Sequence, residues 1–412
     1  MKKKVSHHLK KVAKSAYHKV MNPNLSTGQV VIPRKKIIWA TVSIAILIIL
    51  ATLSYLLYKH YFLSFKTLTK LNYDGAKAQE LLKNPQTLAF TRNNSLYLGS
   101  LLGQEVLLAP PQVLGQKAAN FKISQSRKYI VWEAEMGVLG LDTQNQNVFL
   151  IYQGEPRQSF DLSPLADKIL FLTKSEILEV NLSSGFINKR LTQLQLPNPK
   201  FHFNQIKYSP NGQLAYLRSI HEWSGEKNED IILNLQNSQM NFLKGFSEGR
   251  SLSPLWQGNA NFLAWRGNFI SFALNNSSRT VIDEKTFQSL GPYAYNPQNQ
   301  MLAFVTRKDK VATPSGNFTN ATIFISDLNG QNIKELVSSF DKNLSKNKSG
   351  SITDVGWLNQ DQLWFTFNKN YSQRDLWVIN KQGKDLKKAL ENFDQYSLES
   401  VYMPVTNAYI LY

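Results

Sequence analysis

The chain has 412 residues and a formal net charge of +18, from 47 Lys and Arg against 29 Asp and Glu, and it contains no cysteine. The absence of cysteine excludes disulfides, a lipid-modified cysteine anchor and any thiolate metal or catalytic site. A charge this basic is typical of nucleic-acid-binding proteins, but its distribution along the chain points elsewhere.

Residues 1–36 form a basic tail with ten Lys or Arg and no Asp or Glu. The tail accounts for ten of the 18 net charges, so the rest of the chain keeps 37 minus 29, or +8. Apolar residues recur in the tail at steps of three and four, which predicts an amphipathic helix that ends at Pro23. The lysines expected at the membrane surface are Lys3, Lys10, Lys11, Lys14 and Lys19.

We expect this helix to lie on the anionic inner leaflet of a membrane, where each cation near the surface contributes about 1 kcal/mol. Two alternatives stay open at this point. In the first, the lysines serve only to set the membrane topology. In the second, they dock an acidic cytoplasmic partner. All three interpretations place the tail in the cytoplasm.

An uncharged apolar run, residues 37–58, follows the tail. Its length is close to the ~20 residues that span a bilayer core and exceeds the apolar region of a cleavable signal peptide. Because the basic residues gather before the run, we predict a single-pass protein with its N-terminus inside. A cysteine-free outer domain suits a bacterial plasma membrane and envelope, where nucleic acid is not an expected partner. Residues 59–80 are interpreted as a linker and 81–412 as an extracytoplasmic domain.

The outer domain contains a repeated unit. Residues 208–216 place a Pro-Asn-Gly turn between two strand-like ends, and comparable turns recur at intervals of roughly 40 to 60 residues. They begin at Asn84, Ser124, Ser163, Gln257, Asn296 and Asn359. Most are followed by further short apolar segments. Four short strands per repeat of this length are typical of a propeller blade.

These units, and the segment Ile325-Ser326-Asp327-Leu328-Asn329-Gly330, resemble the repeat of TolB-type and related WD-like β-propellers. The resemblance implies that the first turn joins the innermost strand to the second, and that the Asp-x-x-Gly turn joins the third to the outermost. We therefore expect an all-β propeller, with seven blades preferred and six or eight as alternatives. The C-terminal stretch, residues 401–412, is expected to pair with the first blade and close the ring.

No catalytic residue, cofactor or metal ligand is predicted, and we expect no enzymatic activity. The histidines after the apolar run are His60, His202 and His221, and no Gly-x-Ser-x-Gly motif occurs. Trp132 and Trp364 fall in strand positions that favour a core role. A channel-centred metalloenzyme of lactonase type stays open, because its ligands would come from separate blades and converge only in the folded protein.

Long insertions occupy residues 193–205, 219–230, 307–320, 341–351 and 368–374. In the strand order implied by the resemblance, they emerge on one face, which is where repeat proteins often bind partners. The residues predicted to bind a partner are Trp223, Arg307, Lys308, Lys310, Phe318, Lys346, Lys348, Tyr371 and Arg374. This mixture of cations and aromatic rings suits a protein with an acidic rim and an apolar anchor.

The predicted function is therefore a non-catalytic, membrane-anchored propeller that scaffolds or binds protein partners in the bacterial envelope. The alternative with the same topology is a receptor for an anionic envelope polymer or glycan, using the same basic loops. Such binding would weaken as salt shortens the Debye length.

Overall fold

The computed structural model divides the chain into two compact units, Met1–His60 and Tyr61–Tyr412. It describes residues 34–63, 65–84, 87–100, 103–114, 118–154, 159–173, 176–192, 202–220, 230–243, 255–256, 261–265, 269–273, 278–282, 287, 290–296, 298–313, 316–344, 350–368, 374–393 and 398–400. The predicted amphipathic helix of the tail, with Lys3, Lys10, Lys11, Lys14 and Lys19, lies outside these residues.

The helix of the first unit is α2, Arg34–Tyr61, which has 28 residues. Its segment Thr41–Lys59 has a mean hydropathy of 2.2, and none of it is buried. Among the described residues it is the one helix that is long and apolar enough to cross a membrane. It includes the apolar run that the sequence marks as an anchor, and extends a few residues beyond it on both sides.

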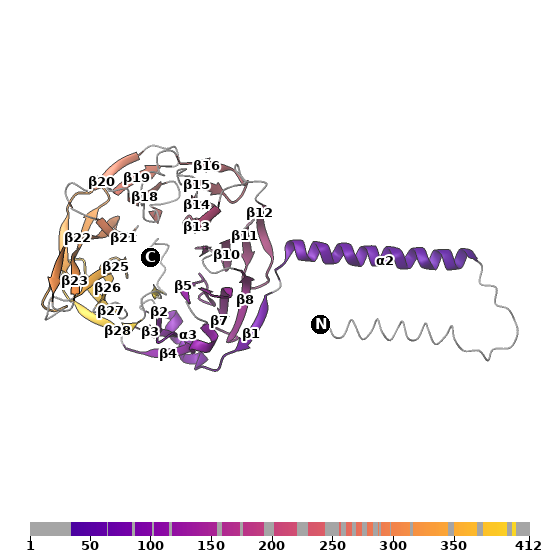
Figure 1. Cartoon of the computed structure of the whole chain (residues 1–412), viewed down its shortest axis with the longest axis horizontal. Helices are drawn as coiled ribbons and strands as arrows, with labels where there is room; N and C mark the ends of the chain where they lie inside the picture. Colours follow the sequence, from indigo (N-terminus) through magenta and orange to yellow (C-terminus); the bar gives the residue numbers. More distant parts are fainter. Residues whose placement is uncertain are drawn as a thin grey trace. The chain divides into compact units, whose positions relative to one another are not determined.

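The second unit is a ring of antiparallel sheets (Figure 1). The described strands form seven sheets, and in each of them strands that follow one another in sequence pair side by side. The first sheet contains β29 (Leu398–Ser400), β2 (Thr87–Arg92), β3 (Ser95–Ser100) and β4 (Glu105–Ala109). The second contains β5 (Ala119–Ile123), β6 (Tyr129–Ala134), β7 (Gly137–Asp142), β8 (Asn147–Gln153) and β1 (Lys66–Lys70).

The next sheets repeat this arrangement without a fifth strand. The third contains β9 (Phe160–Leu162), β10 (Lys168–Leu172), β11 (Glu176–Asn181) and β12 (Ile187–Thr192). The fourth contains β13 (His202–Tyr208), β14 (Leu214–Ile220), β15 (Asp230–Asn234) and β16 (Met240–Phe242). The fifth contains β17 (Leu255–Trp256), β18 (Asn261–Trp265), β19 (Phe269–Ala273) and β20 (Ser278–Ile282).

The last two sheets complete the ring. The sixth contains β21 (Leu290–Asn296), β22 (Met301–Thr313), β23 (Gly316–Asp327) and β24 (Lys334–Ser338). The seventh contains β25 (Ser351–Trp357), β26 (Gln362–Asn368), β27 (Arg374–Asn380) and β28 (Lys387–Phe393). This all-β ring is a β-propeller, and its strand order is the one that the resemblance to TolB-type propellers implies.

The core lies between neighbouring sheets, because successive residues of a strand point to opposite faces. In β6, Ile130 packs into one apolar cluster with Leu141, whereas the adjacent Val131 packs into another with Phe171 of the third sheet. The tryptophans Trp132 and Trp364 are buried, as the sequence predicts. Aromatic and β-branched side chains that fill both faces explain why these segments form strands.

The ring closes between the two ends of the second unit. Strand β29 pairs with β2, with Leu398 opposite Phe90 and Ser400 opposite Leu88. The segment predicted to make this pairing, residues 401–412, lies outside the described residues, and the pairing strand that the structure describes is Leu398–Ser400. Closure of this kind removes two open sheet edges.

The linker residues contribute two elements that the sequence analysis did not predict. Strand β1 pairs with the outer strand β8. Helix α3, Gly75–Lys83, begins at Asp74, whose side chain accepts a hydrogen bond from the backbone of Lys77. A shorter helix, α4 (Pro111–Leu114), follows β4.

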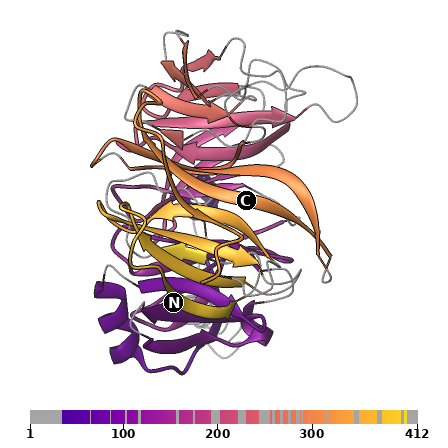
Figure 2. The same cartoon turned by 90° about the vertical axis from the view of Figure 1, so that its left-hand side faces the viewer.

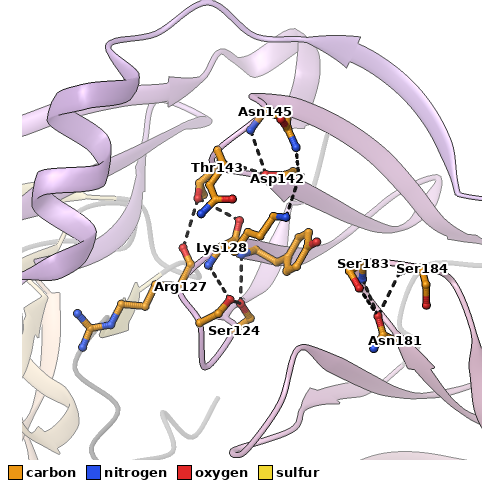
Figure 3. Close-up of polar contacts among 12 residues, drawn as sticks. Ser124, Arg127, Lys128, Asp142, Thr143, Asn145, Asn181, Ser183 and Ser184 are labelled. Carbon is orange, nitrogen blue, oxygen red and sulfur yellow. Dashed lines mark hydrogen bonds and ion pairs between the residues drawn. The ribbon is translucent and has the colours of Figure 1, made fainter.

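One end of the blades is built from short turns that single polar side chains cap. Between the first and second strands, Ser124 and Ser209 accept backbone hydrogen bonds at 3.1 and 2.9 Å. Between the third and fourth, Asp142 and Asn181 cap their turns with bonds of 3.0 and 2.9 Å (Figure 3). The predicted Asp327 turn belongs to the same series. We call this the capped end of the blades.

Candidate functional site

The predicted insertion 307–320 is not a loop. Its residues continue β22 and β23 as one long hairpin, in which Arg307 lies opposite Ala321 and Thr313 opposite Gly316. We call residues 307–321 the arm. Figure 2 shows the two strands in orange, extending beyond their neighbours. The expectation of a loop was wrong because the two segments on either side of the sequence Pro314-Ser315-Gly316 pair with each other.

The flanking strands end before the arm begins. In the registers described, β21 pairs with β22 only as far as Thr306, and β24 pairs with β23 only as far as Thr322. At the base of the arm, the backbone of Ala321 still exchanges hydrogen bonds with Ser339. Beyond that residue the arm pairs within itself, and its two outer edges have no sheet partner among the described strands. Open strand edges present backbone donors and acceptors to an incoming strand.

The structure brings together some of the predicted partner-binding residues and not others. Arg307, Lys308, Lys310 and Phe318 all belong to the arm. The residues outside the described part of the chain are Trp223, Lys346, Lys348 and Tyr371. The five predicted insertions all join strand ends opposite the capped end, because every sheet is an antiparallel meander.

Arg374 does not belong to an exposed basic surface. It is the first residue of β27, is 8% exposed, and its Nη1 lies 2.6 Å from Oδ2 of Asp354 on β25. The same oxygen accepts a hydrogen bond from Thr366. The prediction for Arg374 is therefore corrected: this guanidinium forms a buried ion pair where the connection 369–373 rejoins its sheet.

A second buried ion pair lies at the base of another long connection. Arg218 near the end of β14 and Asp230 at the start of β15 flank residues 221–229, and the Arg218 Nε lies 2.9 Å from the Asp230 Oδ1. The hydroxyl of Tyr216 donates to the same carboxylate. Burial, and secondarily the Asp230 charge, raise the pKa of Tyr216 far above its usual value, so the phenol stays protonated.

Three charged residues occupy equivalent positions on the innermost strands of three consecutive sheets. Lys122 on β5, Asp161 on β9 and Lys207 on β13 each lie two residues before the serine that opens the following turn. We call these three residues the inner belt. The Lys122 Nζ lies 3.0 Å from the Asp161 Oδ1, and the Asp161 Oδ2 accepts a hydrogen bond from the backbone of Tyr208.

Lys207 lies in the most unfavourable environment of the inner belt. It is 8% exposed. Burial is the largest cause that lowers its pKa, to about 7, and the positive charges of Lys122 and Arg218 also lower it, whereas Asp161 opposes them. A titratable group shifted this far is more common at functional sites than elsewhere, although structural networks also produce such shifts.

Sequence reasoning did not identify the inner belt. Each member stands between apolar neighbours, as in Phe160-Asp161-Leu162 and Ile206-Lys207-Tyr208, and looks like an ordinary alternating strand. An alignment of the repeats on their turn serines would have found it, because it places the three charges in one column. Among the described residues, no group of three or more His, Asp or Glu could hold a metal ion.

Comparison with protein-family models and with curated proteins found no match for this sequence. Solved structures resemble it more clearly. A prolyl endopeptidase matches 80% of this chain with a TM-score of 0.53 and 12% identity, and an oligogalacturonate lyase from Vibrio parahaemolyticus matches 80% with 0.53 and 8%. A putative TolB from Agrobacterium tumefaciens matches 76% with 0.42 and 9%.

The second unit is a β-propeller. The chain spans 52% of the prolyl endopeptidase, 87% of the lyase and 90% of the TolB protein. The two neighbours with a TM-score of 0.53 are enzymes of different kinds. At these identities the likeness establishes the fold alone, since one propeller fold serves many functions.

Proposed function

We propose that this protein is a non-catalytic, single-pass membrane protein whose extracytoplasmic propeller binds protein partners in a bacterial envelope through the arm. The observation that carries the proposal is the geometry of β22 and β23, which pair with each other beyond the ends of both flanking strands. We also propose that each of the seven sheets counts as one blade.

The arm favours a protein partner because of its backbone. A protein can add an extended strand to either edge of the hairpin, and the main-chain hydrogen bonds supply affinity that a glycan would not match. The sequence of the arm contains Arg307, Lys308 and Lys310 against the single acidic residue Asp309. This charge balance favours a partner segment with acidic residues.

The helix α2 supports the anchored part of the proposal. A fully exposed apolar helix of this length is costly in water and favourable in a bilayer. The topology can be tested directly because the chain has no cysteine. We expect a Ser126→Cys variant to react with a membrane-impermeant maleimide on intact cells, and a Ser6→Cys variant to react only after permeabilisation; the reverse pattern would contradict the assigned orientation.

Partner binding is tested by crosslinking and co-purification of the full-length protein from its native membrane. In one variant, Asn-Gly replaces residues 308–320 and joins Arg307 to Ala321 as a two-residue turn. This change removes the arm and keeps the sheet. A second variant neutralises Lys308, Lys310, Lys346 and Lys348 as glutamines. We expect a specific protein to be recovered with the wild type, lost without the arm and weakened by neutralisation.

A control variant, Lys384→Gln, changes one exposed charge at the capped end and is expected to recover the same protein as the wild type. Unchanged recovery without the arm would overturn the proposal. Retention on anionic glycan that the neutralised variant loses, with no protein recovered by any form, would instead favour the polymer receptor.

A further inference from the structure

Partner binding at the arm does not explain an exposed phenylalanine, Phe186, that contacts the chain just after α2. We propose that the turn of the third sheet around Phe186 lies in the headgroup region of the membrane and contacts anionic phospholipid there. This inference rests on the anchored part of the proposed function, and it is independent of the arm and of any protein partner.

The segment that follows α2 is fixed to the propeller. We call residues 62–71 the strap. The amide of Leu63 donates a hydrogen bond of 2.8 Å to the carbonyl of Gly185, and Phe62 forms a β-bridge with Phe186. The rings of Phe62 and Phe186 pack edge to face, with their centroids 5.3 Å apart. The strap then continues as β1, which pairs with β8. The turn that contains Phe186 is therefore held where α2 ends.

The chain between the apolar span and this turn is short. The span ends at Lys59, and Phe62 follows it by three residues. Three residues cover about 11 Å when fully extended and about 5 Å in a helix. The headgroup region on each side of the hydrocarbon core is about 5 to 8 Å thick. The ring of Phe186, which touches Phe62, is therefore within reach of this region, whatever the angle between α2 and the propeller.

The turn of the third sheet differs from its counterpart in the fourth sheet. In the third sheet the amide of Asn181 donates to the carbonyl of Phe186 at 2.9 Å. In the fourth, the amide of Asn234 donates to the carbonyl of Gln239 at 2.8 Å, so Gln239 is the equivalent of Phe186. Phe186 is 39% exposed at a position that accepts a polar residue. Aromatic side chains are favourable at the membrane interface, which explains a phenylalanine here.

A glycine shows that the strap and the turn fit each other. Gly185 and Ser238 are equivalent, because their amides donate to the carbonyls of Asn181 and Asn234, each at 2.8 Å. Ser238 has a positive φ of 64°, so this backbone conformation does not by itself require glycine. At Gly185, however, a Cβ would collide with the carbonyl oxygen of Leu63. The close approach of the strap therefore requires glycine in this turn.

The strap adds positive charge to the surface around the turn. Residues 61–73 contain Lys66 and Lys70 and no Asp or Glu. Both lysines are exposed, and Leu68 between them is 38% exposed. Cations near a membrane surface attract anionic lipids. The partner that this surface fits is therefore an anionic phospholipid.

The test is photo-crosslinking of the full-length protein in nanodiscs with equal amounts of phosphatidylglycerol and phosphatidylcholine. The photoreactive residue benzoylphenylalanine replaces Phe186 in one variant and Phe242 in the other. Phe242 is a matched control, because it is 38% exposed but lies on β16 of the fourth sheet. We expect lipid adducts at Phe186, with phosphatidylglycerol favoured by about threefold, and about fivefold fewer adducts at Phe242. No lipid adduct at Phe186, or equal yields at both positions, would overturn the proposal.

A second probe position guards against a folding defect at Phe186. Ser184 is exposed in the same turn (Figure 3), and the photoreactive residue there is expected to give the same lipid adducts. The absence of lipid adducts at Ser184 in a folded variant would also overturn the proposal.

Two further changes, made with the probe at Phe186, separate the strap from the charge. Gly185→Ala disturbs the contact with the strap, so we expect about threefold fewer lipid adducts, whereas Ser238→Ala should change nothing. Lys66→Gln/Lys70→Gln should bring the two lipids to about equal yields, and Lys384→Gln should not. An unchanged yield in Gly185→Ala, or an unchanged lipid preference without the two lysines, would contradict the roles assigned to them.

The same Phe186 probe in native membranes distinguishes lipid from protein. We expect lipid adducts there too, and adducts with a membrane protein in place of lipid would overturn the assignment. Both faces of a nanodisc carry the same lipids, so the nanodisc result depends neither on the orientation of the chain nor on the arm. A failed lipid contact therefore leaves the proposed function standing, whereas a protein that does not insert into nanodiscs would contradict the anchor and this inference together.

Discussion

The two ends of the blades are closed in different ways. At the capped end, short turns are each held by one serine, asparagine or aspartate that bonds to nearby backbone, as at Ser209 and Asn234. At the opposite end, two long connections rejoin their sheets at buried ion pairs, Arg218 with Asp230 and Arg374 with Asp354. Short-range caps suffice where a turn is determined locally, whereas a long connection needs a strong contact at its base.

The largest effect on the free energy of unfolding is expected from breaking one of the buried ion pairs at which the long connections rejoin their sheets. Asp230→Ala leaves the Arg218 guanidinium buried without that carboxylate, so we expect a loss of about 3 to 5 kcal/mol in the free energy of unfolding. Urea unfolding of the full-length protein, followed by tryptophan fluorescence, measures it.

The matched control is Asp361→Ala, which removes an ion pair with Lys381 at the capped end. Because the Asp361 side chain is 66% exposed, we expect a loss of about 0 to 1 kcal/mol. The double variant Arg218→Met/Asp230→Ala should recover part of the loss, since it leaves no stranded charge. Equal losses for Asp230→Ala and Asp361→Ala would remove the difference between the two ends.

A glycine at the capped end tests how closely one turn approaches the neighbouring sheet. Gly330 has a φ of +72°, and a Cβ there would collide with the carbonyl oxygen of Val281. We expect Gly330→Ala to cost about 3 kcal/mol, from the left-handed backbone and the collision together. Gly212 has a similar φ of +64°, but a Cβ there would make only ordinary van der Waals contacts, the nearest at 3.6 Å from the Ser163 Oγ, so Gly212→Ala should cost only about 1 kcal/mol.

Thermal unfolding of the two variants side by side isolates the collision from the backbone preference. If both variants lose the same stability, the Gly330 turn does not need its close contact with β20. The capped end would then consist of independent turns.

The pH dependence of the free energy of unfolding tests the inner belt separately from the two ends of the blades. Because burial holds the pKa of Lys207 at about 7 in the folded protein, below its value of 10.5 in the unfolded chain, the unfolded chain binds more protons between these pH values. The free energy of unfolding should therefore rise with pH, by about 2 kcal/mol from pH 7 to pH 9.

Urea unfolding in chloride buffers measures this rise. In Lys207→Met we expect the rise to be largely absent, because the variant has no amine to deprotonate. An equal rise in both proteins would assign the pH dependence to another group.

The smallest effect is expected from a single turn cap. Asn234→Ala removes the oxygen that accepts from the backbone of Gln236 at 2.8 Å, and we expect a loss of about 1 kcal/mol. Asn234→Asp keeps an acceptor and should change the free energy of unfolding by less. Unfolding of the two variants in parallel checks the role of the oxygen, and a larger loss in Asn234→Asp would contradict it.

The local signals in the sequence predicted the capped end well. Serine, asparagine and proline turns specify their conformation over a few residues, so the turns at Ser124, Ser163 and Asn359 lie where they were expected. The periodic apolar pattern and the repeated turns were sufficient to predict a β-propeller. Strand β1 was missed because a short polar segment acquires its structure only by pairing with β8.

The opposite end depended on contacts that a linear sequence does not reveal. Arg374 follows a polar segment, so the sequence indicates a loop residue. In the fold it is buried in an ion pair with Asp354, 20 positions earlier. The arm was expected to be a loop because it is a long insertion between two strands, although the sequence Pro314-Ser315-Gly316 between its two segments favours a hairpin. Predicting the inner belt would have required an alignment of the three repeats that contain its residues.

The most direct test of partner binding at the arm is site-specific photo-crosslinking in the native membrane. One variant carries the photoreactive residue at Val311 in the arm, and the other carries it at Leu165, which is exposed at the capped end. We predict that Val311 crosslinks to a specific envelope protein and that Leu165 does not. A specific crosslink at Leu165 with none at Val311 would contradict the account.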